Sequence, residues 1–258
     1  MTDKHSDNTD TRGQCPRFHC SSLAGLDLSD GSPDGSRVVR LDAVQSKHAL
    51  RVLRLAVGDE VTLLDGQGTV AQAVIDAAYA GIAACRVTAA RHEPPLRPRL
   101  TLATAIPKGP RGDTMINDLA QLGVDELVPL ITRRSVVHPR DTKLERYHKA
   151  AIEAAKQSGR AWFMQVRPAT ALGQVFTDAD DQGLGLIADP CGEALDDLGT
   201  SLKTADKLTL LIGPEGGFTD GEVQQAQDAG FARWRFSQQT LRIGTAAAAA
   251  VAIVRALT

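Results

Sequence analysis

The stretch Leu211-Ile-Gly-Pro-Glu-Gly-Gly-Phe218 decides how the second half of the chain is interpreted. An apolar run that is typical of a buried strand leads into a loop with three glycines, a proline and one carboxylate. Thr219-Asp-Gly-Glu222 follows, which is the pattern of a capping box at the start of a helix. Loops that bind phosphate offer backbone amides and often a lysine, so the negative charge of Glu215 argues against a polyphosphate ligand.

Outward from this stretch, short apolar runs alternate with helical patterns. The predicted strands cover residues 100–106, 124–131, 184–188, 208–212 and 232–236, and the predicted helices cover residues 113–122, 142–157, 220–229 and 244–257. Thr142-Lys-Leu-Glu145 is a second capping-box pattern, which predicts that the helix at 142–157 opens there. Such alternation indicates an α/β domain with a mostly parallel sheet and helices on both faces. Ligands of these sheets bind at the carboxyl ends of the strands. The candidate binding loops at that edge are residues 107–112, 213–218 and 237–244.

The first part of the chain, residues 16–92, is rich in β-structure instead. Val61–Leu64 and Thr69–Ile75 flank a hairpin-type turn at Asp65-Gly-Gln-Gly68, and a short helix is expected within residues 43–55. We therefore predict a small β-barrel that carries one or two helices.

Three prolines within residues 93–99 exclude a regular element and indicate a linker between two domains. The second domain then covers residues 100–258. Residues 1–15 are polar and predict a disordered tail rather than a signal peptide. The alanine-rich run near the C-terminus is too short to span a membrane, and Arg255 interrupts it.

Composition is typical of an ordinary soluble protein, because 43% of the 258 residues are hydrophobic and 23% are charged. The net charge of -2 excludes a strongly basic nucleic-acid binder, although not local basic patches. Four unevenly spaced cysteines, Cys15, Cys20, Cys85 and Cys191, favour reduced thiols in a cytoplasm over a disulfide framework. His19 beside Cys20 raises the alternative of a zinc site, but no second ligand pair follows, so we predict no metal.

Several common motifs are missing from the sequence. It has no P-loop, no dinucleotide fingerprint, no G-x-S-x-G elbow and no H-E-x-x-H pair. The composition of the glycine loop is compatible with two interpretations. Glu215 could accept bonds from nearby amides in an ordinary loop, or the glycines could let the backbone approach a flat ligand that is neutral or cationic.

Six segments, taken in order, resemble the SPOUT methyltransferases, and among these the bacterial family that methylates N3 of a uridine in 16S ribosomal RNA. The segments are residues 48–68, 105–109, 121–137, 150–160, 211–218 and 241–248. The resemblance implies a PUA-like β-barrel followed by a trefoil-knotted SPOUT domain with a mostly parallel sheet. It also implies a homodimer that uses S-adenosylmethionine and acts on 16S ribosomal RNA or the small ribosomal subunit.

The cofactor has a sulfonium cation and an amino group and no phosphate, so a carboxylate in the glycine loop suits it. The cofactor-binding residues that the resemblance implies are Leu211, Ile212, Gly213, Pro214, Glu215, Gly217, Phe218, Leu241, Ile243, Thr245 and Ala246.

Arg242 is the candidate catalytic residue. Uridine N3 carries a proton at neutral pH, and no histidine lies in the three candidate loops to remove it. A guanidinium offers fixed donors that could position the uracil and stabilise its anionic form. The alternative, an arginine paired with a structural carboxylate, stays open.

Basic residues predict the RNA-binding surface. Between Arg37 and Arg54 there are five basic residues and one acidic residue, and a second basic cluster includes Arg140. Ordinary solvated charge is the alternative for any one of them. The predicted RNA-binding residues are Arg40, Lys47, Arg51, Arg54, Arg133 and Arg134.

The chain also departs from the family pattern. It has Ile243 and Gly244 where the family has threonine and glutamate, Asp118 and Gln121 where it has lysine and glutamate, and Lys156 in place of a glutamate. Two further hypotheses therefore stand beside uridine methylation. One is an RNA-binding homologue with weak or no catalysis, and the other is a methyltransferase that acts on a different RNA.

Overall fold

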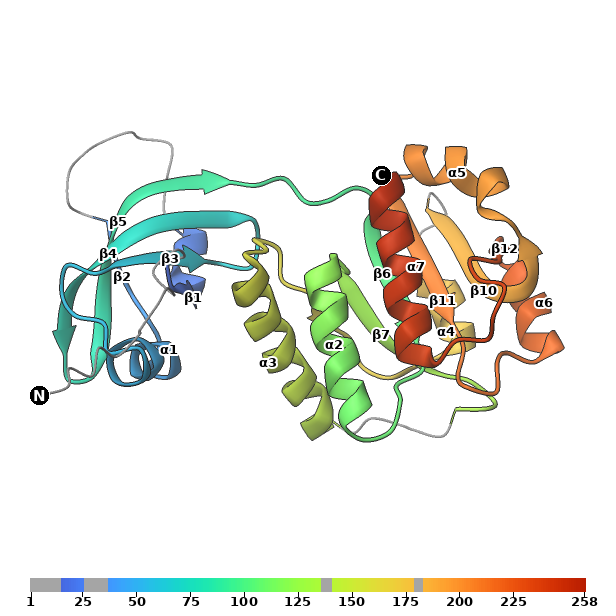
Figure 1. The fold of residues 1–258 in the computed structure, drawn as a ribbon, viewed down its shortest axis with the longest axis horizontal. Helices are drawn as coiled ribbons and strands as arrows, with labels where there is room; N and C mark the ends of the chain where they lie inside the picture. The colour runs from blue at the N-terminus through green and yellow to red at the C-terminus, as the bar shows by residue number, and fades with distance from the viewer. Residues whose placement is uncertain (1–14, 26–36, 136–140, 179–182) are drawn as a thin grey trace, which may run out of the picture. The chain divides into compact units, whose positions relative to one another are not determined.

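The computed structural model describes residues 15–25, 37–135, 141–178 and 183–258 (Figure 1). The chain divides into two compact units, Met1–Glu93 and Pro94–Thr258, and each has its own hydrophobic core. The predicted tail lies outside the described residues except for Cys15. In the part of the chain that the structure describes, no helix is long and apolar enough to cross a membrane.

Among the residues that the structure describes, the first unit contains a five-stranded sheet in the order β1-β3-β4-β5-β2. Its strands are β1 (Arg17–His19), β2 (Val38–Arg40), β3 (Glu60–Leu64), β4 (Thr69–Tyr79) and β5 (Ile82–His92). β1 pairs with β3 in parallel, and the other pairs are antiparallel. The predicted hairpin is confirmed, since β3 and β4 meet at a turn in which Gly66 and Gly68 have positive φ angles. The sequence did not predict β1 or β2, which are too short to show a periodic pattern.

One short helix was expected within residues 43–55, and the structure has two segments there. Asp42 caps α1 (Ala43–Lys47) by accepting the amide of Gln45 at 2.7 Å, and a π-helical turn, η2 (His48–Val52), continues the chain. Arg54 then ends the segment with a φ angle of 57°. A short 3₁₀ helix, η1 (Ser21–Gly25), adds the buried Leu23 to the core of this unit.

The second unit has a sheet in the order β12-β10-β11-β6-β7-β8, with β9 also pairing with β7. Every strand pair between described residues of this sheet is parallel, which confirms the predicted α/β class. Its strands are β6 (Arg99–Thr104), β7 (Glu126–Ile131), β8 (Gln165–Val166), β9 (Thr170–Ala171), β10 (Leu184–Glu193), β11 (Lys207–Ile212) and β12 (Ala232–Trp234). The trefoil knot stays a prediction.

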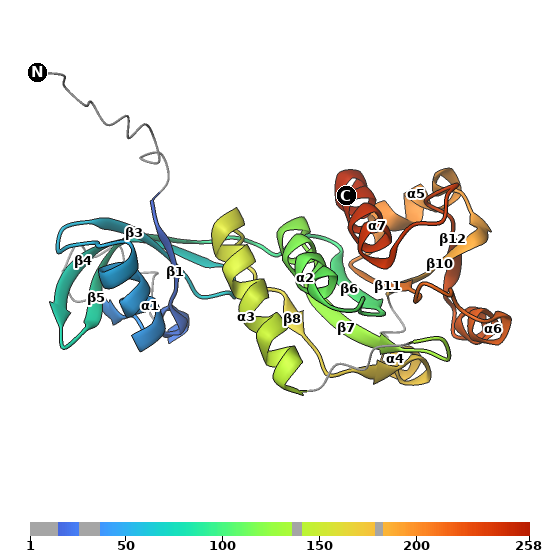
Figure 2. The same cartoon turned by 60° about the horizontal axis from the view of Figure 1, so that its bottom comes forward.

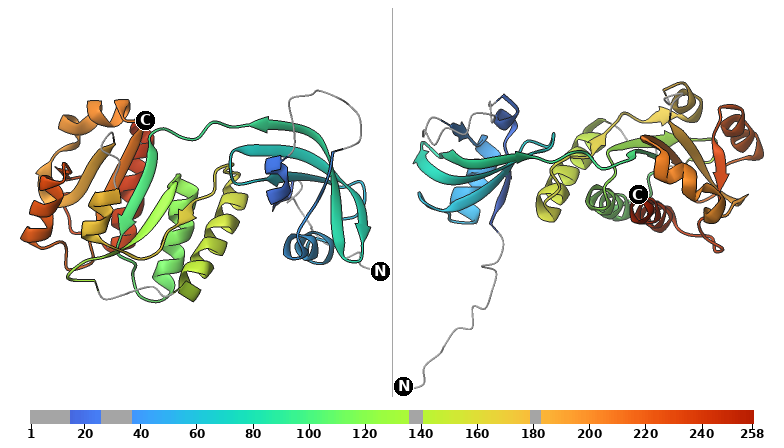
Figure 3. Two further views of the ribbon diagram at one scale, coloured as in Figure 1. Left: turned by 180° about the vertical axis from the view of Figure 1, so that it is seen from behind. Right: turned by 90° about the horizontal axis from the view of Figure 1, so that it is seen from above.

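Six described helices cover the two faces of this sheet. They are α2 (Pro110–Leu122), α3 (Asp141–Ser158), α4 (Leu172–Asp178), α5 (Leu195–Thr204), α6 (Asp220–Asp228) and α7 (Ile243–Leu257). Alternate residues of each strand point to opposite faces, so Leu102 and Leu210 pack with α2 and α7, while Ala103 and Leu211 pack with α4 and α6. Figure 2 shows α2 and α7 on one face of this sheet and α4 on the other. The end of α7 lies beside the start of β6 (Figure 3), where Arg255 donates to the Pro98 carbonyl at 2.7 Å.

The two predicted capping boxes had different outcomes. Thr219 is the N-cap of α6, and its reciprocal bonds with Glu222 confirm the first box. The second box was wrong, because α3 already begins at Asp141 and so contains Thr142. The helix predicted from residue 113 begins three residues earlier, at Pro110, because proline is favourable in the first turn of a helix.

Candidate active site

The carboxyl edge of the parallel sheet carries the segments that were predicted to bind a ligand. Residues 105–109 follow β6, residues 213–219 follow β11, and residues 235–242 join β12 to α7. β6 and β11 are neighbours in the sheet, and the amide of Ala105 donates to the carbonyl of Ile212 at 3.3 Å.

An apolar cluster connects these three segments below the edge. Ile106, Ile212 and Ile243 are buried in one core, and Leu241 packs against it from the loop before α7. Of the predicted cofactor residues, Leu211 and Ile212 end β11, while Ile243, Thr245 and Ala246 lie in the first turns of α7. The fold therefore places the predicted cofactor residues at the end of β11 and those at the start of α7 at the same edge of the sheet.

The glycine loop is tightly turned, and its one carboxylate is exposed. The amide of Gly217 donates to the carbonyl of Pro214 at 2.8 Å, and the φ angle of 69° at Gly217 favours glycine. The ring of Phe218 lies against Gly213, where a β-carbon would come within 3.1 Å of it. Glu215 accepts no hydrogen bond from any residue that the structure describes, so the interpretation in which it binds nearby amides is not seen.

A turn after β7 is bound to the glycine loop, a feature that sequence reasoning missed. Arg134 Nη1 donates to the carbonyl of Gly216 at 2.5 Å, and the Phe218 carbonyl lies 3.4 Å from the same nitrogen. The carboxylate of Glu222 accepts the amide of Arg133 at 2.8 Å and the amide of Thr219 at 2.8 Å. The capping-box pattern predicted the bond between Glu222 and Thr219, but the sequence indicated Arg133 and Arg134 only as basic residues and gave no signal that they contact the glycine loop or Glu222.

The pKa of Glu222 is lowered in this setting. Burial acts to raise the pKa, but the amides of Arg133 and Thr219, the Thr219 hydroxyl and the charge of Arg134 outweigh it. Glu222 is therefore held as a carboxylate that accepts these donors.

Arg242 is the N-cap residue of α7 and is exposed. Its carbonyl accepts the amide of Ala246 at 2.8 Å, while its guanidinium forms no hydrogen bond or ion pair with any described residue. The alternative of a structural ion pair is therefore not seen. A cation at a helix N-terminus is electrostatically unfavourable, so helix stability does not explain this residue.

The departures from the family pattern lie in two places. Ile243 and Gly244 begin α7 at the carboxyl edge, so they belong to the candidate site. Asp118 and Gln121 are exposed near the C-terminal end of α2, and Lys156 pairs with Glu153 in the last turns of α3. Helices in this fold run antiparallel to the strands, so these three residues lie toward the amino edge of the sheet.

The predicted RNA-binding residues fall in both units. Arg40 ends β2, Lys47 ends α1, Arg51 lies in η2 and Arg54 follows it. All four are exposed, and none forms an ion pair with a residue in the described ranges. Arg133 and Arg134 lie in the turn after β7, and Arg140 lies outside the described residues.

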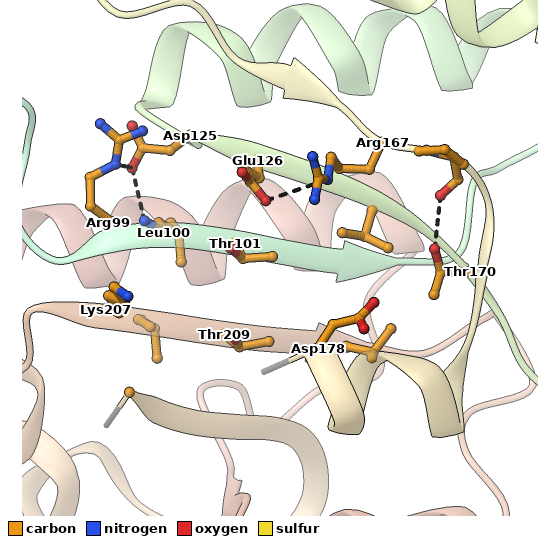
Figure 4. A pocket seen from close by; sticks show the side chains of 15 residues that line it. Arg99, Leu100, Thr101, Asp125, Glu126, Arg167, Thr170, Asp178, Lys207 and Thr209 are labelled. Carbon is orange, nitrogen blue, oxygen red and sulfur yellow. Dashed lines mark hydrogen bonds and ion pairs between the residues drawn. The ribbon is translucent and has the colours of Figure 1, made fainter. Parts of the chain in front are cut away.

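A hollow of about 750 Å³ opens at the amino edge of the sheet, on the face that carries α4 (Figure 4). Its charged lining is largely paired: Arg99 lies 3.6 Å from Asp125, and Arg167 lies 3.8 Å from Glu126. The hollow is at the opposite edge from the glycine loop. Because parallel sheets bind their ligands at the carboxyl edge, we do not place the active site here.

Comparison with known proteins identifies the family. A model described as "RNA methyltransferase domain" matches residues 93–255, and one described as "RNA methyltransferase PUA domain" matches residues 41–78. The ribosomal RNA small subunit methyltransferase E of a Synechocystis strain is 35% identical over 226 residues, which are 85% of this chain and 73% of that protein. The chain belongs to the ribosomal RNA small subunit methyltransferase E family.

Other members of the ribosomal RNA small subunit methyltransferase E family match over nearly the whole chain. The protein of Mycobacterium bovis is 29% identical over 253 residues, covering 92% of this chain and 93% of its own length. The crystal structure of the Neisseria gonorrhoeae enzyme, bound to S-adenosyl methionine, has a TM-score of 0.83 at 27% identity. It covers 95% of this chain and 98% of its own. The predicted family is thus confirmed, and so is the PUA-like character of the first domain.

Proposed function

We propose that the chain uses S-adenosylmethionine to methylate N3 of a uridine in 16S ribosomal RNA, and that it acts in the cytoplasm as a homodimer. One observation carries this proposal: the glycine loop and the N-terminus of α7 lie at the same carboxyl edge of a parallel sheet. The N-cap of α7 is Arg242, whose guanidinium has no partner among the described residues. The family supports the choice of methyl transfer to ribosomal RNA, and the bound ligand of the Neisseria gonorrhoeae enzyme supports the choice of cofactor.

The residues at the carboxyl edge fit the cofactor. Glu215 offers an exposed carboxylate, unpaired within the described ranges, to a cationic ligand, which suits a sulfonium and an amino group. Gly216 and Gly217 are exposed and have no side chain, so their backbone is accessible to a ligand, and Leu241 with Ile243 adds an apolar side. When bound, S-adenosylmethionine supplies an electrophilic methyl group. The residues proposed to hold it are Leu211, Ile212, Gly213, Pro214, Glu215, Gly217, Phe218, Leu241, Ile243, Thr245 and Ala246.

Arg242 is proposed as the catalytic residue. Uridine N3 becomes nucleophilic when it loses its proton, and negative charge then spreads over the ring and its two carbonyl oxygens. The guanidinium of Arg242, which no described residue engages, can donate to these oxygens, and so orient the uracil and stabilise its anionic form.

The first domain is proposed to bind RNA. We assign this role to residues 16–92, with residues 93–99 as the linker and residues 100–258 as the methyltransferase domain. Arg40, Lys47, Arg51 and Arg54 are exposed and unpaired among the described residues, so they are available to phosphates.

The proposed reaction is tested with small ribosomal subunits and free 16S RNA from a strain that lacks the orthologous enzyme. The purified chain and S-adenosylmethionine are added, and the RNA is digested and mapped by mass spectrometry. We expect one N3-methyluridine to appear. Methylation of a different RNA or base would contradict the substrate, and cofactor binding without any methylation would favour the RNA-binding homologue.

The role of Arg242 has its own test. Arg242→Ala should bind S-adenosylmethionine as the wild type does, measured by calorimetry, because the guanidinium is assigned to the uracil. Its turnover should fall by about 10²- to 10³-fold, the usual loss when one donor to a developing negative charge is removed. Unchanged turnover would exclude Arg242 from the mechanism.

A further inference from the structure

The glycine loop is not held in place by the sheet alone. It follows β11, whereas the turn that contacts it, Thr132–Ser135, follows β7. β6 lies between these two strands, so they are separated by two strand spacings, roughly 9–10 Å. The contacts made by Arg134 and Glu222 therefore span the end of β6 and join two loops that do not leave neighbouring strands.

The geometry points to Arg134 as a positioning residue for the cofactor loop, an inference that rests on the proposed function. Its guanidinium fixes the carbonyl of Gly216, the residue at the centre of the loop. Because the peptide group is planar, fixing that carbonyl also fixes the amide of the next residue, Gly217. That amide closes the turn by donating to the carbonyl of Pro214 at 2.8 Å. One peptide plane thus connects Arg134 to the turn that shapes the site.

The stem of Arg134 is part of the same contact. A β-carbon on Gly216 would lie 3.2 Å from Cδ of Arg134, so the glycine leaves the space in which the arginine stem lies along the loop. The same Nη1 nitrogen reaches toward the Phe218 carbonyl, and the ring of Phe218 covers Gly213. Arg134 therefore restrains both the middle and the end of the loop.

Glu222 fixes the position of the arginine. Its carboxylate accepts the backbone amide of Arg133, which anchors the turn after β7, and it also accepts the amide of Thr219 at the end of the glycine loop. This bond uses the backbone of Arg133 and leaves its side chain exposed. The two adjacent arginines thus differ: the side chain of Arg134 holds the loop, and that of Arg133 does not.

This assignment differs from the sequence-based prediction that Arg134 binds RNA. A guanidinium that contacts phosphate contributes to RNA affinity, whereas one that donates to the carbonyls of the glycine loop contributes to the conformation of that loop. Loss of a phosphate contact weakens RNA binding and its salt dependence. Loss of a loop restraint weakens cofactor binding, because the loop must then be ordered when the ligand arrives.

Calorimetry of the full-length protein with S-adenosylmethionine tests the inference. Arg134→Met keeps the apolar stem and removes the donors, so we expect its Kd for the cofactor to rise at least tenfold. Arg133→Met is the matched control, and its Kd should stay within twofold of the wild type. Arg134→Lys keeps the charge but replaces the planar guanidinium by a shorter side chain with a compact ammonium group, and its Kd should rise at least threefold.

Kinetics and RNA binding separate a loop-positioning role of Arg134 from direct contact with RNA. Arg134→Met should raise KM for S-adenosylmethionine with kcat retained at saturating cofactor, while its Kd for RNA stays within twofold. A cofactor Kd within twofold of the wild type in both Arg134 variants would overturn the inference. Weaker binding of RNA together with an unchanged cofactor Kd would show that Arg134 contacts RNA instead, and would also overturn it. If the wild type itself fails to bind S-adenosylmethionine, the proposed function fails first. If Arg134→Met does not fold, Arg134→Lys decides the outcome.

Discussion

Glu222 shows how much one residue contributes to the site. Its two carboxylate oxygens accept bonds from the backbone of Arg133 and from the amide and hydroxyl of Thr219. The sequence predicted it as the third residue of a capping box, and that role is confirmed. The structure adds a second role, because the same carboxylate joins α6 to the turn after β7.

Replacement of Glu222 by glutamine should destabilise the protein in a pH-dependent way. A glutamine amide cannot accept through both ends, so we expect Glu222→Gln to lower the free energy of unfolding by about 1–2 kcal/mol at pH 7. The pKa of Glu222 is lowered in the folded state. Its stabilisation is therefore fully present above the unfolded pKa of about 4.3, and it is lost as the pH falls through the folded pKa.

Urea unfolding at several pH values measures this effect. Trp162 and Trp234 are the two tryptophans of the chain, and both lie in the second unit, so their fluorescence follows its unfolding. The difference between wild type and Glu222→Gln should shrink as the pH falls below about 4. Glu145→Gln, at an exposed position of α3, should change stability by less than about 0.5 kcal/mol. A pH-independent difference would contradict the assignment.

At the scale of elements, one buried carboxylate joins the amino edge of the sheet to the last helix. Asp125, just before β7, accepts from Arg160 at 2.8 Å and from Arg255 of α7 at 3.1 Å. It also accepts the amide of Leu100 at 2.8 Å, and Arg99 lies 3.6 Å from it. Burial lowers the pKa of Arg160 to about 10, although Asp125 opposes that shift, so the guanidinium stays protonated at pH 7.

Loss of the Asp125 charge should therefore be costly. Asp125→Asn leaves buried guanidinium groups without a counter-charge, and we expect a loss of about 3–5 kcal/mol in the free energy of unfolding. The control is Asp206→Asn, which removes an exposed pair with Arg97 and should cost at most about 1 kcal/mol. Urea unfolding followed by tryptophan fluorescence compares the two. If both variants lost the same free energy of unfolding, the assigned role of Asp125 in stabilising the amino edge of the sheet would be wrong.

At the scale of the whole molecule, the net charge of -2 requires any electrostatic RNA binding to be local. Combined replacement of Arg40, Lys47, Arg51 and Arg54 by alanine should weaken RNA binding. It should also reduce the slope of log K against log salt by about 3, because each phosphate contact contributes about 0.7 to 0.9. Filter binding at several salt concentrations gives both quantities.

A matched pair of arginines in the same unit provides the control. Arg86 pairs with Asp76, and Arg91 pairs with Glu93, so both are already neutralised by neighbours. Their double replacement by alanine should leave the salt slope nearly unchanged. A flat salt response of the wild type, or an equal change in the two sets of variants, would exclude the proposed RNA surface.

The sequence by itself determined the class of the second unit, the hairpin at Asp65–Gly68, the helix that begins after Thr219 and the position of the glycine loop. These features depend on local patterns, in which periodicity, glycine and capping residues act within a few positions. Only the tertiary structure decided that Arg134 meets Gly216, 82 positions away, and that Arg255 meets Asp125, 130 positions away. The order of strands in the sheet sets these contacts, and that order follows from the packing of the whole core rather than from any spacing along the chain.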